Sequence, residues 1–119
     1  MHILITGSNG FIGYNLAKSL ANSNYIVGID NDEISDWVKK IRSSDKQVHK
    51  FYNVSINDTK HLSNIMKDED IDIVIHLAAK TGVRSSFEQK QQYIDTNING
   101  FLSVLDAMLE ANVKKLVFA

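Results

Sequence analysis

The stretch ILITGSNGFIG, residues 3–13, constrains the fold more than any other part of the chain. A short apolar run is followed by Gly7, Gly10 and Gly13 at even spacing, and then by a segment with helical periodicity. This order predicts a buried strand, a tight turn, and a helix whose positive end points at that turn. Glycine accepts positive φ and leaves room for a phosphate group. The motif therefore predicts a dinucleotide-binding turn, with a purely structural turn as the alternative.

An acidic residue follows where the adenosine ribose of a dinucleotide would lie. Asp30 ends the second apolar run, YIVGID, residues 25–30. A carboxylate there can accept hydrogen bonds from both ribose hydroxyls and would repel a 2′-phosphate, which favours NAD over NADP. The alternative is a residue of the turn that ends the strand, because Asp-Asn is a good turn sequence.

The rest of the chain alternates short apolar runs with segments of helical periodicity. Strands are predicted over residues 3–6, 25–30, 47–52, 71–77 and 115–118, and helices over 11–20, 33–41, from Asn57 or Asp58 onward, and 91–111. Strands separated by helices indicate right-handed crossovers and a parallel sheet. We therefore expect an α/β fold: a Rossmann-type parallel sheet of about five strands in the order 3-2-1-4-5, with helices on both faces.

Helical periodicity also predicts which side chains share a face. In the first helix one face carries Ile12, Leu16, Ala17 and Leu20. In the long helix the side chains predicted to point inward are Ile94, Ile98, Phe101, Leu102, Leu105 and Leu109.

Composition excludes several classes of function. The chain has 119 residues, enough for one domain, and its net charge of −1 gives no footprint for nucleic acid or an anionic membrane. The absence of cysteine excludes disulfides and thiolate metal sites. No apolar stretch approaches a membrane span, so we expect a soluble cytoplasmic protein. The four histidines have no metal-ligand spacing; His76 is predicted to be a core residue, and residues 68–70 a solvated turn.

Four motifs resemble the extended short-chain dehydrogenase/reductases, specifically the NAD-dependent nucleotide-sugar epimerases and dehydratases. They are TGSNGFIG, HLAA at 76–79, DTNINGFLSVLDA from 95, and KKLVFA at 114–119. The resemblance implies NAD as cofactor and a phosphate-binding turn over residues 6–13. The cofactor-binding residues it implies are Gly7, Asn9, Gly10, Phe11, Ile12, Gly13, Asp30, Asn31, Asn53, Val54, Leu77, Ala78, Ala79, Lys80 and Asn97.

Within that set, the resemblance assigns Asp30 to the ribose, residues 53–54 to the adenine, and residues 77–80 to the ribose and nicotinamide side. Family members usually carry Asp at the position of Asn53, so the adenine contact is a weaker inference. Asn97 matches an asparagine of the long helix behind the active site. A solvated helix position is its alternative.

The stretch AAKTGVRSSFEQ, residues 78–89, resembles sugar-nucleotide 4-epimerases, including those that act on uronic acid sugars. The resemblance implies that Arg84 and Ser85 border the nucleotide-sugar substrate. An arginine can bind phosphate or carboxylate through two hydrogen bonds. A solvated loop arginine is the alternative.

The resemblance also places the reaction chemistry after the fifth strand, in a Ser/Thr and a Tyr-x-x-x-Lys pair. Only Tyr14 and Lys18 have that spacing here, and they fall in the phosphate-binding helix, so no catalytic residue is predicted. We expect residues 1–119 to be an incomplete NAD-binding Rossmann domain, truncated after the fifth strand and without its substrate domain.

The expected function is that of the amino-terminal portion of a UDP-sugar 4-epimerase, of UDP-glucuronate or UDP-glucose type. Such an enzyme acts by transient hydride transfer at C4. Two alternatives stay open: an inactive NAD-binding or interaction module, and a portion of an NDP-sugar 4,6-dehydratase. Because KKLVFA would form an exposed sheet edge, we also expect a homodimer or a swapped oligomer through that edge.

Overall fold

The computed structural model describes residues 1–31, 48–79 and 89–119. The helices are α1 (Phe11–Leu20), α3 (Thr59–Asp68), α5 (Lys90–Ile94) and α6 (Gly100–Ala111), with a π-helical turn η1 (Asp95–Asn99) between the last two. The strands are β1 (His2–Thr6), β2 (Tyr25–Asp30), β3 (Lys50–Asn53), β4 (Ile73–His76) and β5 (Lys115–Phe118). The helix predicted over 33–41 lies outside the described residues.

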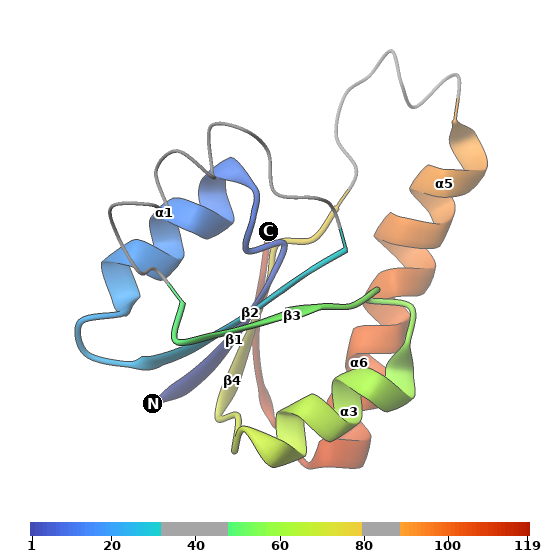
Figure 1. Cartoon of the computed structure of the whole chain (residues 1–119). Coiled ribbons are helices and arrows are strands. Elements are labelled where there is room, and N and C mark those ends of the chain that lie inside the picture. The colour runs from blue at the N-terminus through green and yellow to red at the C-terminus, as the bar shows by residue number, and fades with distance from the viewer. Residues whose placement is uncertain (32–47, 80–88) are drawn as a thin grey trace.

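The five strands form one sheet in the order β3-β2-β1-β4-β5, and every neighbouring pair is parallel. Figure 1 shows α1 on one face of this sheet and α3 and α6 on the other. The predicted fold class, strand order and helices on both faces are thus confirmed. Since all strands are parallel, their carboxyl ends meet at one end of the sheet, where α/β proteins bind their ligands.

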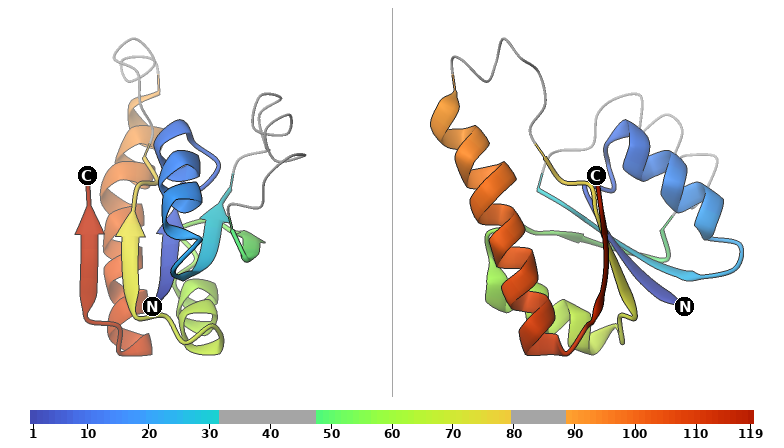
Figure 2. Two further views of the ribbon diagram at one scale, coloured as in Figure 1. Left: turned by 90° about the vertical axis from the view of Figure 1, so that its left-hand side faces the viewer. Right: turned by 180° about the vertical axis from the view of Figure 1, so that it is seen from behind.

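The central strands β2, β1 and β4 are largely buried on both faces, as expected for parallel strands. On one face Ile3, Ile5 and Ile26 pack with Ala17 of α1. On the other, Leu4 and its neighbours form a larger core with side chains of α3 and α6. Figure 2 shows the helices on the two sides of the sheet, with β5 at one edge of it.

The inward face predicted for the long helix is wrong for four of its six residues, whereas Phe101 and Leu105 are half-buried. Ile94, Ile98, Leu102 and Leu109 are exposed, by 44% to 80% of their surface. The side chains of α6 that are buried are mostly small: Gly100, Ser103, Val104, Ala107 and Met108. The helix is also not continuous, because the π-helical turn adds a residue between α5 and α6 and changes the face that each presents.

Contact with α3 and the loop before it explains why small residues face inward. A Cβ at Gly100 would lie 2.8 Å from Ile56 Cγ1, so a larger side chain there would require the Ile56 side chain to move. Three residues later, the hydroxyls of Ser103 and Thr59 are hydrogen-bonded at 2.6 Å. These contacts fix the register of α6 against α3, and the large apolar side chains are left on the opposite side.

Other boundaries differ in detail. The third and fourth strands begin later than predicted, at Lys50 and Ile73, and the fourth ends at His76. The Oδ1 atom of Asp58 accepts the His61 amide at 3.1 Å, which confirms Asp58 as the N-cap of α3. Ile12 is 65% exposed and does not share the buried face of α1.

The turn predicted at residues 68–70 is not fully solvated, because the Glu69 side chain is only 10% exposed. Its two oxygens accept the hydroxyls of Tyr25, at 2.9 Å, and Tyr52, at 2.6 Å. Lys50 Nζ lies 3.7 Å from Oε1, and the His2 ring nitrogen Nδ1 is 2.7 Å from the Glu69 carbonyl oxygen. This Glu69 cluster ties together the amino-terminal side of β1, β2 and β3.

Among the described residues, no helix has the length and apolar character needed to cross a membrane.

Candidate cofactor site

The turn after β1 is held tightly against its neighbours. Gly7 has φ +71°, a conformation that L side chains rarely adopt, and a Cβ there would lie 2.9 Å from the Ala78 nitrogen. The amides of Gly7 and Ser8 both donate to the Ile29 carbonyl oxygen, at 2.8 and 3.2 Å. The backbone of the turn is therefore fixed by the ends of both neighbouring strands, β2 and β4.

The other two glycines of the motif have different neighbours. A Cβ on Gly13 would collide with the carbonyl oxygen of Gly7 and lie 2.9 Å from Ser8 Cα, so helix α1 can approach the turn only with glycine there. Among the described residues, a Cβ on Gly10 would meet only the Gly7 oxygen, at 3.3 Å. The fold thus requires Gly7 and Gly13 more strongly than Gly10. The absence of a side chain at Gly10 leaves room beside the turn.

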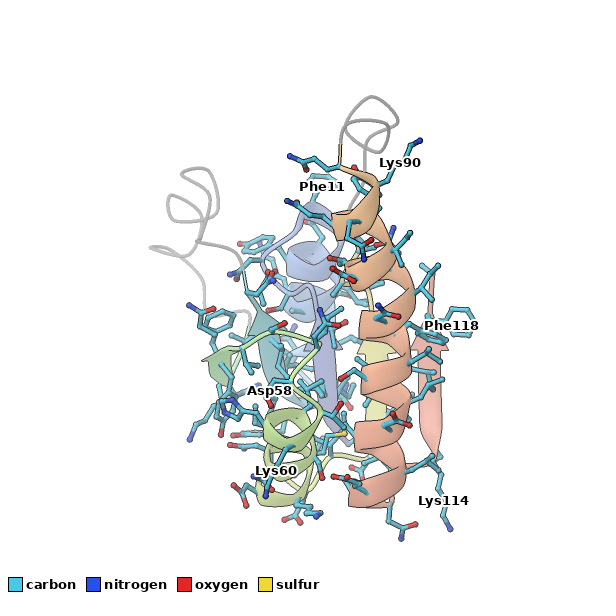
Figure 3. The ribbon with its side chains drawn as sticks, turned by 90° about the vertical axis from the view of Figure 1, so that its right-hand side faces the viewer. Phe11, Asp58, Lys60, Lys90, Lys114 and Phe118 are labelled. Atoms are coloured by element: carbon cyan, nitrogen blue, oxygen red, sulfur yellow. The ribbon has the colours of Figure 1, made fainter. Side chains whose placement is uncertain are left out.

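Helix α1 begins directly after Gly10 and points its first turn at this space. No side chain within the described residues caps it, and Gly10, its N-cap, has φ −74° and ψ 171°. The first-turn amides of a helix have no carbonyl partner inside the helix and attract anions. Phe11 and Ile12 are 71% and 65% exposed there. Figure 3 shows Phe11 at the same end of the molecule as Lys90, which begins α5.

Asp30 connects the turn to the ends of the next two strands. Its Oδ2 accepts the amide of the buried Asn9 at 3.0 Å, and its carbonyl oxygen accepts the Val54 amide at 3.1 Å. The half-buried carboxylate therefore lies beside the glycine turn, at the carboxyl end of β2. This is the place where an acid can bind the ribose hydroxyls of a dinucleotide.

The end of β4 forms the other side of the site. Thr6 Oγ1 accepts the amides of Leu77 and Ala78, both at 3.1 Å, and lies 2.7 Å from Nδ1 of His76. His76 is 6% exposed, which confirms its prediction as a buried residue. Burial lowers the pKa of its imidazole. The chain after β4 is thus held against the end of β1.

A cavity of about 290 Å³ lies next to the end of β4. It is lined by His76, Ala78, Ala79, Asn97, Phe101, Phe118 and Ala119. The ring of Phe101 lies 5.5 Å from that of His76 and 5.3 Å from that of Phe118, measured between centroids. Asn97, inside the π-helical turn, lines the same cavity as Ala78 and Ala79. The structure thus brings together three of the predicted site residues.

Most of the remaining predicted residues lie at the carboxyl ends of the strands. Asn31 and Asn53 are exposed, at the ends of β2 and β3. The Val54 side chain is buried in the core with that of Leu4, and its amide donates to the Asp30 carbonyl oxygen. Lys80, Arg84 and Ser85 lie outside the described residues.

Two features of the site were missed from the sequence. The π-helical turn that carries Asn97 has no local sequence signature, although such turns are frequent at functional sites. The bond between Thr6 and His76 joins residues on two strands, and only the parallel register, which pairs Thr6 with His76, reveals it. A threonine at the end of one predicted strand and a histidine one residue before the end of its neighbour would have been the available signal.

The residues present fit a dinucleotide. Gly10 leaves a cradle that a Cβ would partly fill, α1 points its amino end into it, and Asp30 lies at its side. Within the described residues, no group of three or more metal-ligating side chains is present. A parallel sheet of this order with a glycine turn at its carboxyl end defines a Rossmann-type protein.

Comparison with known proteins narrows the class. Residues 3–119 match the NAD dependent epimerase/dehydratase family, and the chain belongs to that family. It is 40% identical to Protein CapI of Staphylococcus aureus over 124 residues, which cover 100% of this chain and 37% of that protein. It is 37% identical to the UDP-glucuronate 4-epimerase of Thermodesulfobacterium geofontis, covering 99% of this chain and 38% of that protein.

A solved structure of an epimerase has the same fold over nearly the whole of this chain. The UDP-glucose 4-epimerase of Stenotrophomonas maltophila, with bound NAD and formylated UDP-arabinopyranose, superposes with a TM-score of 0.89 at 30% identity. The match covers 99% of this chain and 36% of that one. The chain therefore spans little more than a third of the length of the curated relatives it matches, and it corresponds to their amino-terminal part.

Proposed function

We propose that residues 1–119 are the NAD-binding part of a UDP-sugar 4-epimerase. The match to the NAD dependent epimerase/dehydratase family supports the cofactor, and the similarity to a UDP-glucuronate 4-epimerase and a UDP-glucose 4-epimerase supports the sugar nucleotide. In this proposal the chain is one NAD-binding Rossmann domain, and substrate recognition also depends on residues outside it.

The observation that carries the proposal is the position of Asp30. Its carboxylate accepts the Asn9 amide at 3.0 Å and so lies beside the glycine turn, where the adenosine ribose of a bound dinucleotide reaches the end of β2. Helix α1 would bind the pyrophosphate with its first-turn amides, and Gly10 would let it approach the backbone. The negative charge of Asp30 disfavours a 2′-phosphate, which selects NAD over NADP.

When bound, NAD supplies a hydride acceptor for the sugar C4 position and later the donor that returns the hydride. The residues of this chain have other tasks in the proposal. The turn and Asp30 bind and orient the adenosine half, and residues 77–79, with Lys80, line the ribose and nicotinamide side. Asn97 and the cavity at the end of β4 lie next to that side. Arg84 and Ser85 are proposed to border the substrate.

Calorimetric titration of the 119-residue chain with NAD and NADP tests the cofactor proposal. We expect NAD to bind with at least tenfold higher affinity than NADP, a difference of about 1.4 kcal/mol. The Asp30→Ala variant should bind NAD more weakly and lose most of that preference. Asp106→Asn, which removes an exposed carboxylate from α6, is the matched control and should keep both affinities. Absence of NAD binding at millimolar concentration would contradict the proposal.

Incubation of the chain, and of the whole protein that contains it, with NAD and UDP-glucuronate or UDP-glucose separates the functional alternatives. The 4-epimer should form only when the residues that complete the active site are present, so the chain alone should bind NAD without turnover. Conversion of a sugar nucleotide to a 4-keto-6-deoxy product by the whole protein would instead favour the dehydratase alternative.

We also propose cytoplasmic action, and self-association of the 119-residue chain through β5, which lies at one edge of the sheet formed by the described residues. Val117 and Phe118 in this strand are 52% and 63% exposed, and unpaired edge strands with apolar side chains pair readily. Figure 3 shows Phe118 projecting beside α6. Light scattering that shows a clean monomer at tens of micromolar would contradict this part of the proposal.

A further inference from the structure

The hydroxyl of Thr6 is the centre of a small network at the junction of β1 and β4. Its oxygen accepts two backbone amides, those of Leu77 and Ala78, both at 3.1 Å. The Leu77 amide is shared with the Thr6 carbonyl oxygen at 3.2 Å. A hydroxyl oxygen has two acceptor lone pairs and one proton to donate. With both lone pairs used by the two amides, the proton remains for the third partner, Nδ1 of His76, at 2.7 Å.

This count favours one tautomer of His76. If Thr6 donates to Nδ1, that nitrogen carries no proton, and the neutral ring carries its proton on Nε2. A proton on Nδ1 would give Thr6 Oγ1 a third donor. The surroundings also oppose a charged ring: His76 is 6% exposed, and burial lowers its pKa. Among the described residues the side chains that face it are uncharged, namely Thr6 of β1, Asn97 of η1, Phe101 of α6 and Phe118 of β5.

The network joins two segments of the proposed cofactor site. Gly7, whose backbone contacts that of Ala78, directly follows Thr6 and begins the phosphate-binding turn. Leu77 and Ala78 directly follow His76 and are proposed to line the ribose and nicotinamide side. We infer that His76 is a positioning residue: as a neutral acceptor it orients the Thr6 hydroxyl, which holds the glycine turn and the β4 end in the relative position that NAD requires.

The inference rests on the proposed NAD function, but the hydrogen bond at its centre can be tested without cofactor. Long-range ¹H–¹⁵N correlation spectra of the ¹⁵N-labelled chain report which ring nitrogen of His76 carries the proton. We expect Nδ1 unprotonated and Nε2 protonated at neutral pH, and a changed Nδ1 shift in Thr6→Val with little change in Thr6→Ser. A proton on Nδ1, or no response to Thr6→Val, would overturn the inference.

NAD titration of two His76 variants tests the effect on the site. His76→Asn can place its amide oxygen where Nδ1 lies, whereas His76→Leu fills similar space with no acceptor. We expect His76→Leu to weaken NAD binding by about three- to tenfold, the size expected for one hydrogen bond, and His76→Asn to restore most of it. Equal affinity of the two variants and the parent chain would overturn the inference.

If the variants do not fold, Thr6→Val and Thr6→Ser provide the same comparison from the other partner. Failure of the parent chain itself to bind NAD would instead overturn the proposed function and remove the cofactor part of this inference. The spectra of the unliganded chain would still decide whether His76 is the acceptor.

Discussion

The two ends of the sheet each rely on one carboxylate, but they use it differently. At the amino-terminal side, the Glu69 carboxylate accepts hydrogen bonds from two tyrosine hydroxyls and lies near Lys50. Its charge is therefore compensated by partners within the chain. At the carboxyl end, the Asp30 carboxylate accepts a hydrogen bond from a backbone amide of the glycine turn, next to the first turn of α1. The first arrangement joins strands through side chains, whereas the second presents backbone amides and a carboxylate around a small open space.

The difference separates stability from binding. Side chains whose hydrogen bonds are made to one another, as in the Glu69 cluster, stabilise the fold and leave few donors or acceptors for a ligand. A site for a dinucleotide needs close approach to the backbone, which glycine allows at some cost in conformational entropy. We therefore expect substitutions at the Glu69 end to change the free energy of unfolding, and substitutions at Gly10 and Asp30 to change NAD affinity.

The largest effect is expected at Gly13, which is an exception to this division. It belongs to the glycine motif of the site, but the fold also requires it. A Cβ there collides with the Gly7 carbonyl oxygen and Ser8. Gly13→Ala should therefore lower the free energy of unfolding by about 3 kcal/mol or more, or prevent folding. Urea unfolding followed by circular dichroism measures this. A variant as stable as the parent chain would show that α1 does not approach the turn as closely as described.

Glu69→Ala should affect stability without affecting the site. It leaves the hydroxyls of Tyr25 and Tyr52 without their acceptor, and we expect a loss of about 2–4 kcal/mol in the free energy of unfolding. The affinity of the folded variant for NAD should stay within about twofold of that of the parent chain, a difference of roughly 0.4 kcal/mol. Asp68→Asn, an exposed neighbour, is the control for the loss of charge. A large change in NAD affinity would show that the two ends are coupled.

Gly10→Ala should change NAD affinity more than it changes the free energy of unfolding. Within the part of the chain that the structure describes, its Cβ would meet only the Gly7 oxygen, at 3.3 Å, so the free energy of unfolding should fall by less than about 1 kcal/mol. The same methyl group occupies space that the pyrophosphate needs, and NAD affinity should drop by about tenfold or more. Unfolding and calorimetric titration on the same preparation check both parts. Undiminished NAD binding would place the pyrophosphate elsewhere.

The smallest expected effect is on the pH dependence of stability. The Tyr52 hydroxyl bond, with Tyr25 and Lys50, lowers the pKa of Glu69 below its ordinary value of 4.5. Glu69 thus binds its proton more weakly in the folded chain, and its contribution to stability is present above about pH 4.5 and lost as pH falls below that. Its hydrogen bond also raises the pKa of Tyr52 from 10.0 to about 12, so stability should fall again as pH rises through that range.

The free energy of unfolding of the parent chain and of Glu69→Gln, measured from acid to alkaline pH, tests this prediction. The free energy of unfolding should fall less steeply toward acid pH in the variant, which has no carboxylate at position 69 to protonate. Identical curves for the two proteins would contradict a stabilising role for the Glu69 charge.

Much of the fold could be predicted because its signals are local. The glycine spacing, the apolar runs and the polar residue that caps α3 each act within a few residues of the chain. Alternating strands and helices then leave few arrangements, since crossovers between parallel strands are right-handed. The strand order and the position of Asp30 beside the turn follow from these rules.

What could not be predicted depends on contacts between distant segments. Counting large apolar residues placed Leu102 and Leu109 inward, but close approach of α6 to Ile56 selects Gly100 and its small neighbours for the buried face. Glu69 looked like part of a charged turn, and only the sheet brings Tyr25 and Tyr52 to it. The network of Thr6 and His76 likewise needs the register of β1 and β4.

The most direct test of the account is to map NAD onto the chain by NMR. In ¹H–¹⁵N spectra of the labelled protein titrated with NAD, we predict that the amides that shift are those of the glycine turn, the end of β2 and residues 77–79. The amides around Glu69, at the opposite end, should not move. Shifts centred on the Glu69 end, or no shifts at millimolar NAD, would contradict the claim that the carboxyl end of this sheet is an NAD site.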